Sequence, residues 1–371
     1  MKILIDARLW GLENAGIGRY TINLIQELAK IDRENEYIIL LRAKYYHQIS
    51  LKENFTKVIA DIPPYTIAEQ AILGKIIGRY EPDVVHYPHF NIPVLYKGKF
   101  LVTIHDMLMH KETRGATTQP LPVYLVKHMV YKQVFRRGVL ASRKIIVPTN
   151  AVKKEVAHYY KIDENKIATI YEGVTKLADS QVESALILQK YKLETPFFVY
   201  TGNAYPHKNL ERAISAIVRL NQHSRAYFAI VCTRNVFTKR LEKTIDRLGA
   251  KHYIRLTGFV PDEELSVIYK NALGFLFPSL SEGFGLPGLE AIAAGTLPVI
   301  SNIEAFKEVY ANHALYFNPY RIDDMADALM KVVKMKKNKR EDFIKSAGEF
   351  ITRYSWEKMA VETLKVYKSV D

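Results

Sequence analysis

The sequence predicts an α/β protein built from two doubly wound domains, each with a parallel sheet covered by helices. The chain has 371 residues, which is long for one ordinary core and suits two domains. Short apolar runs alternate with amphipathic stretches, which is typical of buried parallel strands joined by helices. This alternation occurs twice, and a polar stretch between residues 173 and 195 separates the two series.

The first series lies in the N-terminal half. A helix is expected over residues 17–30, where Tyr20, Leu24, Ile25 and Leu28 recur at helical spacing. The expected strands cover residues 2–6, 37–42, 83–87, 100–104 and 144–147.

The second series repeats this rhythm and ends in a long helix. Ser355 is a good N-cap, and Trp356, Met359 and Tyr367 recur at helical spacing after it. We expect a first domain over residues 1–175 with the closing helix 355–371, and a second domain over residues 176–354. The expected strands of the second domain cover residues 197–201, 227–232, 253–256, 274–277, 298–301 and 314–317.

Composition limits the class of partner and the compartment. Lys and Arg number 53 against 39 Asp and Glu, which gives a formal net charge of +14. This excess favours an anionic partner such as nucleic acid, acidic lipid or a phosphorylated small molecule, although solubility alone would also explain it. The single cysteine, Cys232, lies in an apolar run, so we expect a buried thiol and a reducing compartment. Neither a signal peptide nor an apolar run of ~20 residues is visible, so we expect a cytoplasmic protein.

The most informative segment covers residues 281–291, which follow an expected strand. Gly283 and Gly285 permit a tight turn with positive φ, and Pro287 suits the first position of a helix. Gly295 suits the end of that helix. The segment therefore predicts a strand, a glycine loop and a helix.

This arrangement places two glutamates where a ligand can reach them. Glu282 lies on the loop. Glu290 is expected in the first helical turn, where its carboxylate can accept hydrogen bonds from two adjacent hydroxyls, such as those of a ribose. The amides of Phe284, Gly285 and Leu286 lie at the helix N-terminus, where an anionic or oxygen-rich ligand is favoured. Each glutamate alone would be explained as a solvated charge, and only the whole constellation indicates a site.

The segment resembles the E-x7-E signature of retaining GT-B glycosyltransferases, in particular glycosyltransferase family 4 (glycosyltransferase group 1). The resemblance implies two Rossmann-like domains facing a central cleft, the N-terminal one binding the acceptor and the C-terminal one the nucleotide-sugar donor. It also implies that the C-terminal helix crosses back to the N-terminal domain. Other matches along the chain are residues 16–20, 103–106, 147–150, 200–203, 206–210 and 354–356.

The resemblance implies roles for single residues. Lys208 would contact the donor diphosphate, in agreement with the attraction of an ammonium group for phosphate. Glu282 would bind sugar hydroxyls and help to stabilise charge, while Glu290 would bind the ribose. His105 would lie near the reacting sugar, and Asp106 would orient it or form part of the acceptor site. A packed histidine beside a helix-capping aspartate is the alternative for this pair.

The implied donor site departs from the family pattern at one position. Many relatives carry arginine where this chain has Asn203, so one positive charge on the diphosphate is missing or comes from a neighbouring base. Two glycines after the first strand would let backbone amides approach phosphate or sugar. The expected donor-binding residues are Gly16, Gly18, Arg19, Gly202, Asn203, His207, Lys208, Asn209, Phe284, Gly285, Leu286 and Glu290; the expected catalytic residues are His105, Asp106 and Glu282.

The implied reaction is hexosyl transfer of the EC 2.4 class with retention of the anomeric configuration. The leaving diphosphate would accept the proton of the acceptor on the same face. The sequence holds no His-x3-His, Cys-x2-Cys or compact carboxylate cluster, and Asp323 and Asp324 begin a late helix. We therefore expect no metal and no other cofactor. Lys208, neighbouring bases and helix N-termini would meet the phosphate charge.

A basic stretch over residues 121–144 lies in the first domain. Its bases alternate with aromatic and aliphatic residues and no acidic residue occurs among them, a pattern typical of helices on membrane surfaces. A core helix with a solvated basic face is the alternative. The membrane interpretation predicts a lipid-linked acceptor and peripheral contact with the inner face of the cell membrane. The bases expected on that surface are Lys127, Lys132, Arg136 and Arg137.

Other functions stay open at this point. A nucleotide-sugar 2-epimerase on the same fold would need an additional acid–base constellation and no acceptor. A nucleic-acid-binding protein is indicated by charge alone, without any recognition motif. A dehydrogenase would need a complete dinucleotide fingerprint, but Thr21 stands where the third glycine would be. The phosphate-loop residues resemble mannosyltransferase-like members, which use GDP-mannose, and UDP-hexoses stay open.

Overall fold

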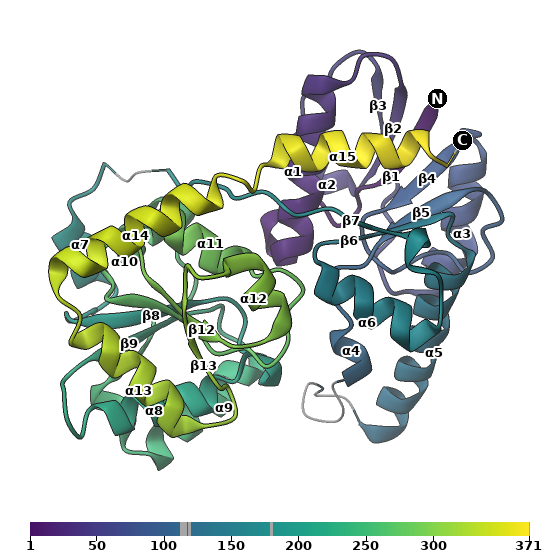
Figure 1. Ribbon diagram of the computed structural model, residues 1–371. Helices are drawn as coiled ribbons and strands as arrows, with labels where there is room; N and C mark the ends of the chain where they lie inside the picture. The colour runs from purple at the N-terminus through teal and green to yellow at the C-terminus, as the bar shows by residue number, and fades with distance from the viewer. Residues whose placement is uncertain (112–116, 118–119, 179–180, 371) are drawn as a thin grey trace. The chain divides into compact units, whose positions relative to one another are not determined.

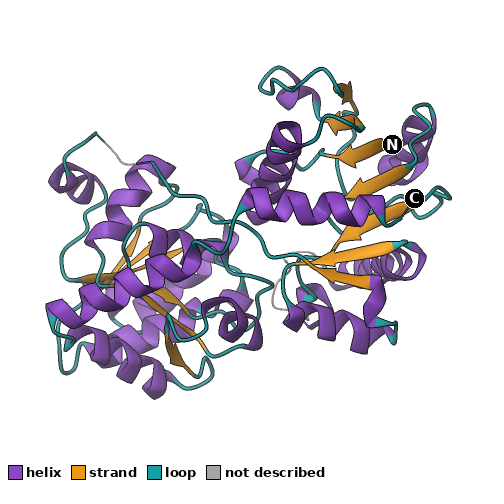
Figure 2. Ribbon diagram, turned by 45° about the horizontal axis from the view of Figure 1, so that its top comes forward, coloured by secondary structure: helices purple, strands orange, loops and turns teal. Residues whose placement is uncertain are grey.

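The computed structural model describes residues 1–111, 117, 120–178 and 181–370 of the chain (Figure 1). The chain divides into two compact units. Unit 1 comprises Met1–Lys111, Gln119–Gly173 and Tyr354–Asp371, and unit 2 comprises Glu112–Thr118 and Val174–Arg353. Each unit has its own parallel sheet and its own helices (Figure 2).

Unit 1 contains a parallel sheet of seven strands in the order β3-β2-β1-β4-β5-β6-β7. Its central strands are buried along almost their whole length, which explains their continuous apolar character. The strands are β1 (Lys2–Asp6), β2 (Glu36–Leu41), β3 (Phe55–Ile59), β4 (Val84–Tyr87), β5 (Phe100–Thr103), β6 (Lys144–Val147) and β7 (Ile167–Thr169). The helices are α1 (Ala15–Ile31), α2 (Ala43–Tyr46), α3 (Ile67–Gly78), α4 (Leu108–Lys111), α5 (Leu121–Ala141), α6 (Asn150–Tyr160) and α15 (Trp356–Lys368), with 3-10 turns at Leu12–Asn14 and Glu164–Lys166.

Unit 2 contains a parallel sheet of six strands in the order β10-β9-β8-β11-β12-β13. The strands are β8 (Phe197–Thr201), β9 (Tyr227–Val231), β10 (Ile254–Leu256), β11 (Gly274–Phe277), β12 (Pro298–Ser301) and β13 (Leu315–Phe317). The helices are α7 (Ser184–Lys190), α8 (Leu210–Leu220), α9 (Val236–Arg247), α10 (Asp262–Asn271), α11 (Leu286–Ala293), α12 (Glu304–Tyr310), α13 (Ile322–Val333) and α14 (Lys337–Ile351), with 3-10 turns at Pro206–Lys208 and Ala250–His252.

Each sheet has one point where the strand order reverses. In unit 1 this point lies between β1 and β4, and in unit 2 it lies between β8 and β11. Loops that leave neighbouring strands in opposite directions open a crevice there, at the carboxyl ends of the strands. The topology therefore marks one place in each unit where a ligand is expected.

The predicted doubly wound α/β class is confirmed, and the predicted strands appear with ends that differ by at most one residue. Two strands of unit 1 were missed, β3 and β7. Both lie at the edges of the sheet. An edge strand needs less apolar sequence: β3 contains Thr56 and Lys57, and β7 is only three residues long.

The C-terminal helix belongs to unit 1, as the resemblance implied. Helix α15 packs against α1, where Met359, Ala360 and Tyr367 are fully buried. The hydroxyl of Tyr367 lies 2.6 Å from Nδ1 of His86 on β4, inside the core. In the described part of the chain, helices of 18 or more residues fall short of the hydropathy that a membrane span requires.

Candidate functional site at the switch point of unit 2

The loops that follow β8 and β11 bring Lys208 and Glu282 together. Their Nζ and Oε1 atoms are 2.5 Å apart, although the residues are 74 positions apart in the sequence. The hydroxyl of Ser279 donates a second hydrogen bond to the same Oε1 at 2.7 Å. The two charged side chains are 14% and 15% exposed. Two residues chosen separately from the sequence thus form one ion pair at the expected crevice, within reach of solvent.

The glycine bend before α11 is held by tight packing against α12. Gly285 has a φ of 103°, and a Cβ atom there would come within 2.8 Å of the Phe306 ring. A Cβ at Gly288 would come within 2.3 Å of the Tyr310 hydroxyl. That hydroxyl donates to the carbonyl of Gly285 at 2.5 Å. Both glycines are therefore required by close approach, and the bend that positions Glu282 is rigid.

Two details of the predicted helix start were wrong by one residue. Helix α11 begins at Leu286, so Pro287 occupies the second position and not the first. Glu290 is consequently the fifth residue, in the second turn, where the helix dipole contributes less. Gly285 in the left-handed region starts the helix earlier than a proline at the first position would. Glu290 is 5% exposed, and the predicted stop at Gly295 has the expected positive φ of 86°.

Other predicted donor residues shape the loops. The Asn209 side chain donates to the carbonyls of Pro278 and Pro319 at 3.0 and 2.8 Å and accepts from Arg212 at 2.8 Å. These contacts engage both polar atoms of the Asn209 side chain, which connects its own turn to the loops at Pro278 and Pro319. The side chain is therefore not directed at a donor, contrary to the prediction. The carbonyl of His207 accepts from the Leu280 amide at 2.8 Å, which joins the two crevice loops directly.

In the turn after β8 and in the bend before α11, the groups that can face a ligand belong mainly to the backbone. Gly202 has a φ of 148°, and a Cβ there would meet the Tyr200 hydroxyl at 2.7 Å. That hydroxyl donates to the Asn203 carbonyl at 2.7 Å, which fixes the turn. The Phe284 and Leu286 side chains are buried. Any donor contact of these two residues would come from the backbone.

The two glycines near the first strand do not lie in a loop. Helix α1 starts at Ala15, so Gly16 and Gly18 belong to its first turns together with Arg19. Gly18 is buried, and a Cβ there would come within 1.9 Å of the Gly11 carbonyl oxygen. Close packing therefore requires Gly18, whereas a Cβ at Gly16 would meet open space.

His105 in unit 1 is held by a residue that the sequence analysis missed. Its Nδ1 lies 3.0 Å from Oε1 of Glu172 and its Nε2 lies 3.0 Å from the carbonyl oxygen of Pro88. Asp106 instead accepts from the amide of Leu108, the first residue of α4, at 2.9 Å. The predicted orienting contact to His105 thus comes from Glu172 and not from Asp106. The sequence contains no motif around Glu172 that would indicate this contact. Glu172 lies close to His105 only because of the order of the strands in the sheet.

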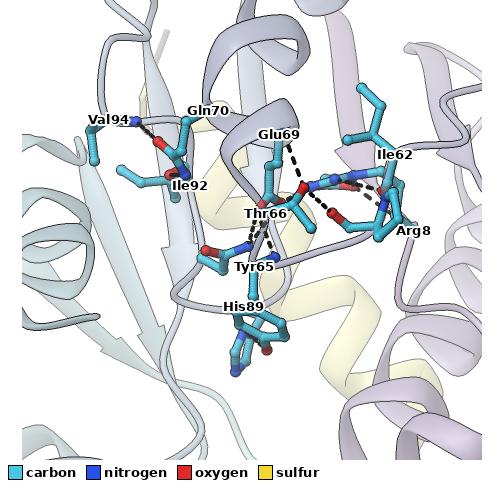
Figure 3. Close-up of polar contacts among 12 residues, drawn as sticks. Arg8, Ile62, Tyr65, Thr66, Glu69, Gln70, His89, Ile92 and Val94 are labelled. Carbon is cyan, nitrogen blue, oxygen red and sulfur yellow. Dashed lines mark hydrogen bonds and ion pairs between the residues drawn. The ribbon is translucent and has the colours of Figure 1, made fainter. Parts of the chain in front are cut away.

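The switch point of unit 1 contains a buried ion cluster that the sequence analysis also missed (Figure 3). The guanidinium group of Arg8 forms ion pairs with Asp6 at 2.7 Å and with Glu69 at 2.5 Å. All three side chains are at most 8% exposed. Glu69 also accepts from the side chain of Asn91 and from the amide of Tyr65. These contacts saturate the charges and leave an adjoining cavity of about 10 Å³, enough for about one water.

The bases that were predicted to face a membrane lie on α5, which carries no acidic residue. Lys127, Lys132, Arg136 and Arg137 are exposed. The N-terminal half of the helix also exposes its apolar residues, with Met129 62% exposed, and only the C-terminal half contributes to the core. The apolar residues exposed in that first half are Leu121, Val123, Leu125, Val126, Met129 and Val130.

The residues that the structure describes contain no group of three or more His, Cys, Asp or Glu side chains able to hold a metal ion. Metal independence stays a prediction, because the phosphate oxygens of a substrate can supply metal ligands that the protein alone does not provide.

Comparison with known proteins covers both units. Residues 14–176 match the profile of Glycosyltransferase Family 4, and residues 186–350 match that of Glycosyl transferases group 1. The chain is 24% identical to the O-antigen chain mannosyltransferase RfbU of Salmonella typhimurium, over 96% of this chain and 97% of that protein. It is 26% identical to O-antigen chain mannosyltransferase B of Escherichia coli, over 99% and 100% of the two chains.

Solved structures share the fold. The structure of WaaG, a glycosyltransferase involved in lipopolysaccharide biosynthesis, superposes with a TM-score of 0.73 at 14% identity, over 99% of both chains. Anabaena HepE in complex with UDP and glucose gives 0.76 at 14% identity, over the full length of both. The two family profiles together span both units, and the solved structures share the architecture. The chain therefore belongs to the GT-B glycosyltransferases of family 4.

Proposed function

We propose that this glycosyltransferase moves a hexose from a nucleotide-sugar donor bound by unit 2 to a saccharide or lipid-linked acceptor bound by unit 1. We favour mannose, carried by GDP, as the sugar, and a UDP-hexose is the second candidate. The two O-antigen mannosyltransferases that match over nearly their whole length support mannose and a cell-surface glycan as the product.

The Lys208–Glu282 ion pair carries the proposal. A lysine with one carboxylate partner and access to water can exchange that partner for the diphosphate of a donor, which offers a stronger charge-assisted contact. Glu282 is then released to accept hydrogen bonds from hydroxyls of the sugar. Ser279 keeps its carboxylate oriented during the exchange. Donor binding and presentation of Glu282 are thereby coupled in one step.

The proposed transfer is metal-independent and retains the anomeric configuration. The bond from the anomeric carbon to the donor phosphate oxygen breaks, and the bond from that carbon to the acceptor hydroxyl oxygen forms on the same face. The hydroxyl proton passes to the leaving phosphate oxygen. Lys208 and the amides at the start of α11 would stabilise the charge that develops on the diphosphate, and Glu290 would hold the ribose.

Nucleotide binding to single-residue variants tests this site. In Lys208→Ala, we expect the affinity for GDP or UDP, measured by isothermal titration calorimetry, to fall about 10- to 100-fold through loss of a charge-assisted contact. In Glu282→Gln, we expect diphosphate affinity to stay or to rise, because the competing carboxylate is gone, while sugar transfer is lost.

Lys190→Ala is the matched control, because Lys190 forms an ion pair of similar length with Glu264 on the surface of the same unit. It should bind nucleotide like the wild type. Undiminished affinity of Lys208→Ala for both nucleotides would remove Lys208 from the donor site. Incubation with donor alone separates the transferase from an epimerase, which would release an epimerised sugar without acceptor.

We also propose that α5 docks on an anionic membrane, where a lipid-linked acceptor would be found. Apolar side chains exposed together on one helix mark an interaction surface. The bases beside them match acidic headgroups, and each contributes ~1 kcal/mol near an anionic leaflet. Exposed apolar residues and positive charge on the same helix thus favour a lipid surface.

Vesicle binding tests the docking surface. We expect the protein to sediment with phosphatidylglycerol vesicles at low salt and not with phosphatidylcholine vesicles. Met129→Glu should weaken this binding strongly, because a charge enters the apolar interface. Phe259→Glu, at a residue of unit 2 that is 72% exposed, is the control and should bind like the wild type. Equal binding of both vesicle types, or none, would contradict the proposal.

A further inference from the structure

The hydrogen-bond partners of His105 favour its charged form. Both ring nitrogens lie 3.0 Å from an oxygen, one in the Glu172 carboxylate and one in the Pro88 carbonyl. A carbonyl oxygen and an ionised carboxylate can only accept hydrogen bonds. The two contacts therefore favour a ring that carries hydrogen on both nitrogens, an imidazolium with both of its N–H groups engaged.

The groups around His105 agree with a charged ring. Burial alone lowers the pKa of His105, but the hydrogen bond and charge of Glu172, followed by the Pro88 carbonyl and Asp106, raise the pKa above its usual value. The other histidines nearby, His86 and His89, stay neutral because burial and the charge of His105 lower the pKa of each to about 3.

One further neighbour of His105 is aromatic. The Tyr20 ring meets the His105 ring edge-on at 4.9 Å. The Tyr20 hydroxyl is engaged with Thr103, and burial raises its pKa above the usual value, so it stays neutral. Glu172 is therefore the direct anionic partner of His105, with Asp106 as the second acid that acts on it.

The C-terminal segment of the chain fixes Glu172. On one side of it, a Cβ atom at Gly173 would come within 2.3 Å of the Trp356 amide nitrogen. On the other side, the Tyr171 ring packs against Tyr354 at 5.6 Å. Glu172 itself is 4% exposed. Its carboxylate thus has little freedom, and its position depends on the return of the chain into unit 1.

We propose that Glu172 is a positioning residue that holds His105 in its imidazolium form, so that His105 serves the transfer by its fixed place and does not exchange a proton. This inference rests on the proposed function only where it concerns the transfer. His105 lies at the carboxyl end of β5 and is 14% exposed, so one edge of the ring reaches the surface of the site. Its two N–H groups are not available to a substrate while Glu172 and Pro88 hold them.

Nuclear magnetic resonance of the His105 ring tests the protonation state without any substrate. The His105→Asn spectrum assigns the signal. In the wild type we expect the ring to titrate above the ordinary pKa of histidine, and in Glu172→Gln a titration moved down by about one unit or more, because the amide accepts a hydrogen bond but carries no charge. Glu172→Asp should restore part of the shift. Glu164→Gln, an exposed acid of the same unit, should leave it unchanged.

The pH profile of kcat/KM tests the link to transfer. We expect a flat wild-type profile where a free histidine would titrate, and a profile in Glu172→Gln that falls on the alkaline side as the ring loses its proton. Titration of wild-type His105 near its ordinary pKa would overturn the inference even if transfer proceeds. If no donor supports transfer but the ring stays charged, the proposed function fails and the positioning role stands.

Discussion

The switch points of the two units carry charged groups in opposite situations. In unit 1, Arg8 is enclosed by two carboxylates, and Glu69 is fully buried. In unit 2, Lys208 has one carboxylate partner, and both side chains keep contact with water. A cation enclosed by two anions is part of the core, because any exchange would leave buried charge unpaired. A cation with one partner and access to solvent can exchange it for a ligand. The same topology therefore supports a structural cluster in one unit and a binding site in the other.

The largest expected effect separates these two roles by stability. Glu69→Ala leaves Arg8 with one carboxylate partner and removes the acceptor of Asn91 and of the Tyr65 amide, so we expect a loss of about 3–5 kcal/mol in the free energy of unfolding. Glu282→Ala at the partly buried pair of unit 2 should cost clearly less, because Lys208 then keeps its access to water. Urea denaturation at neutral pH measures both. Equal losses would mean that the two clusters do not differ in the way proposed.

A smaller effect distinguishes tight packing from backbone strain at the two glycines that flank α11. Gly285→Ala meets both a φ of 103° and the Phe306 ring at 2.8 Å, and we expect a loss of about 2–3 kcal/mol. Gly295→Ala has a φ of 86° but open space around the new methyl group, so it should cost only about 1 kcal/mol. Thermal unfolding of both variants gives the difference, and only Gly285→Ala should also weaken nucleotide binding. A larger loss for Gly295→Ala would argue against the packed bend.

The smallest effect concerns pH and belongs to unit 1. His86 is neutral when folded because burial, followed by the charge of His105, lowers its pKa to about 3. Below pH 6.5 the unfolded chain binds a proton at this residue that the folded chain does not, so stability falls as the pH falls. We expect about 1 kcal/mol between pH 6 and pH 5 from this residue. His86→Gln should make that limb less steep when denaturation is repeated across this range, with His89 as the source of the remaining slope, and an unchanged slope would exclude His86 as a cause.

His105 acts in the opposite direction. Its pKa is raised on folding, so its contribution to stability is fully present below pH 6.5 and is lost as the pH rises through the raised value. The contribution of these two histidines taken alone is therefore greatest near pH 6.5.

Much of the fold was readable because it depends on local pattern. The central strands are continuous apolar runs, the glycine–proline bend marks the start of α11, and Ser355 marks the start of α15. Edge strands such as β3 and β7 were missed, because one side of an edge strand needs no apolar partner. The start of α11 was misplaced by one residue, because Gly285 and its contact with Phe306 decide it, and that contact comes from another helix.

By itself the sequence determined which residues could carry the chemistry: Lys208, Glu282 and His105 stand in recognisable motifs next to expected strands. Only the tertiary structure decided their partners. It joined Lys208 to Glu282, gave Glu172 to His105 in place of Asp106, and enclosed Arg8 between two carboxylates. The physical reason is that motifs are set by neighbours along the chain, whereas charge pairing is set by strand order, which brings together residues that no local pattern connects.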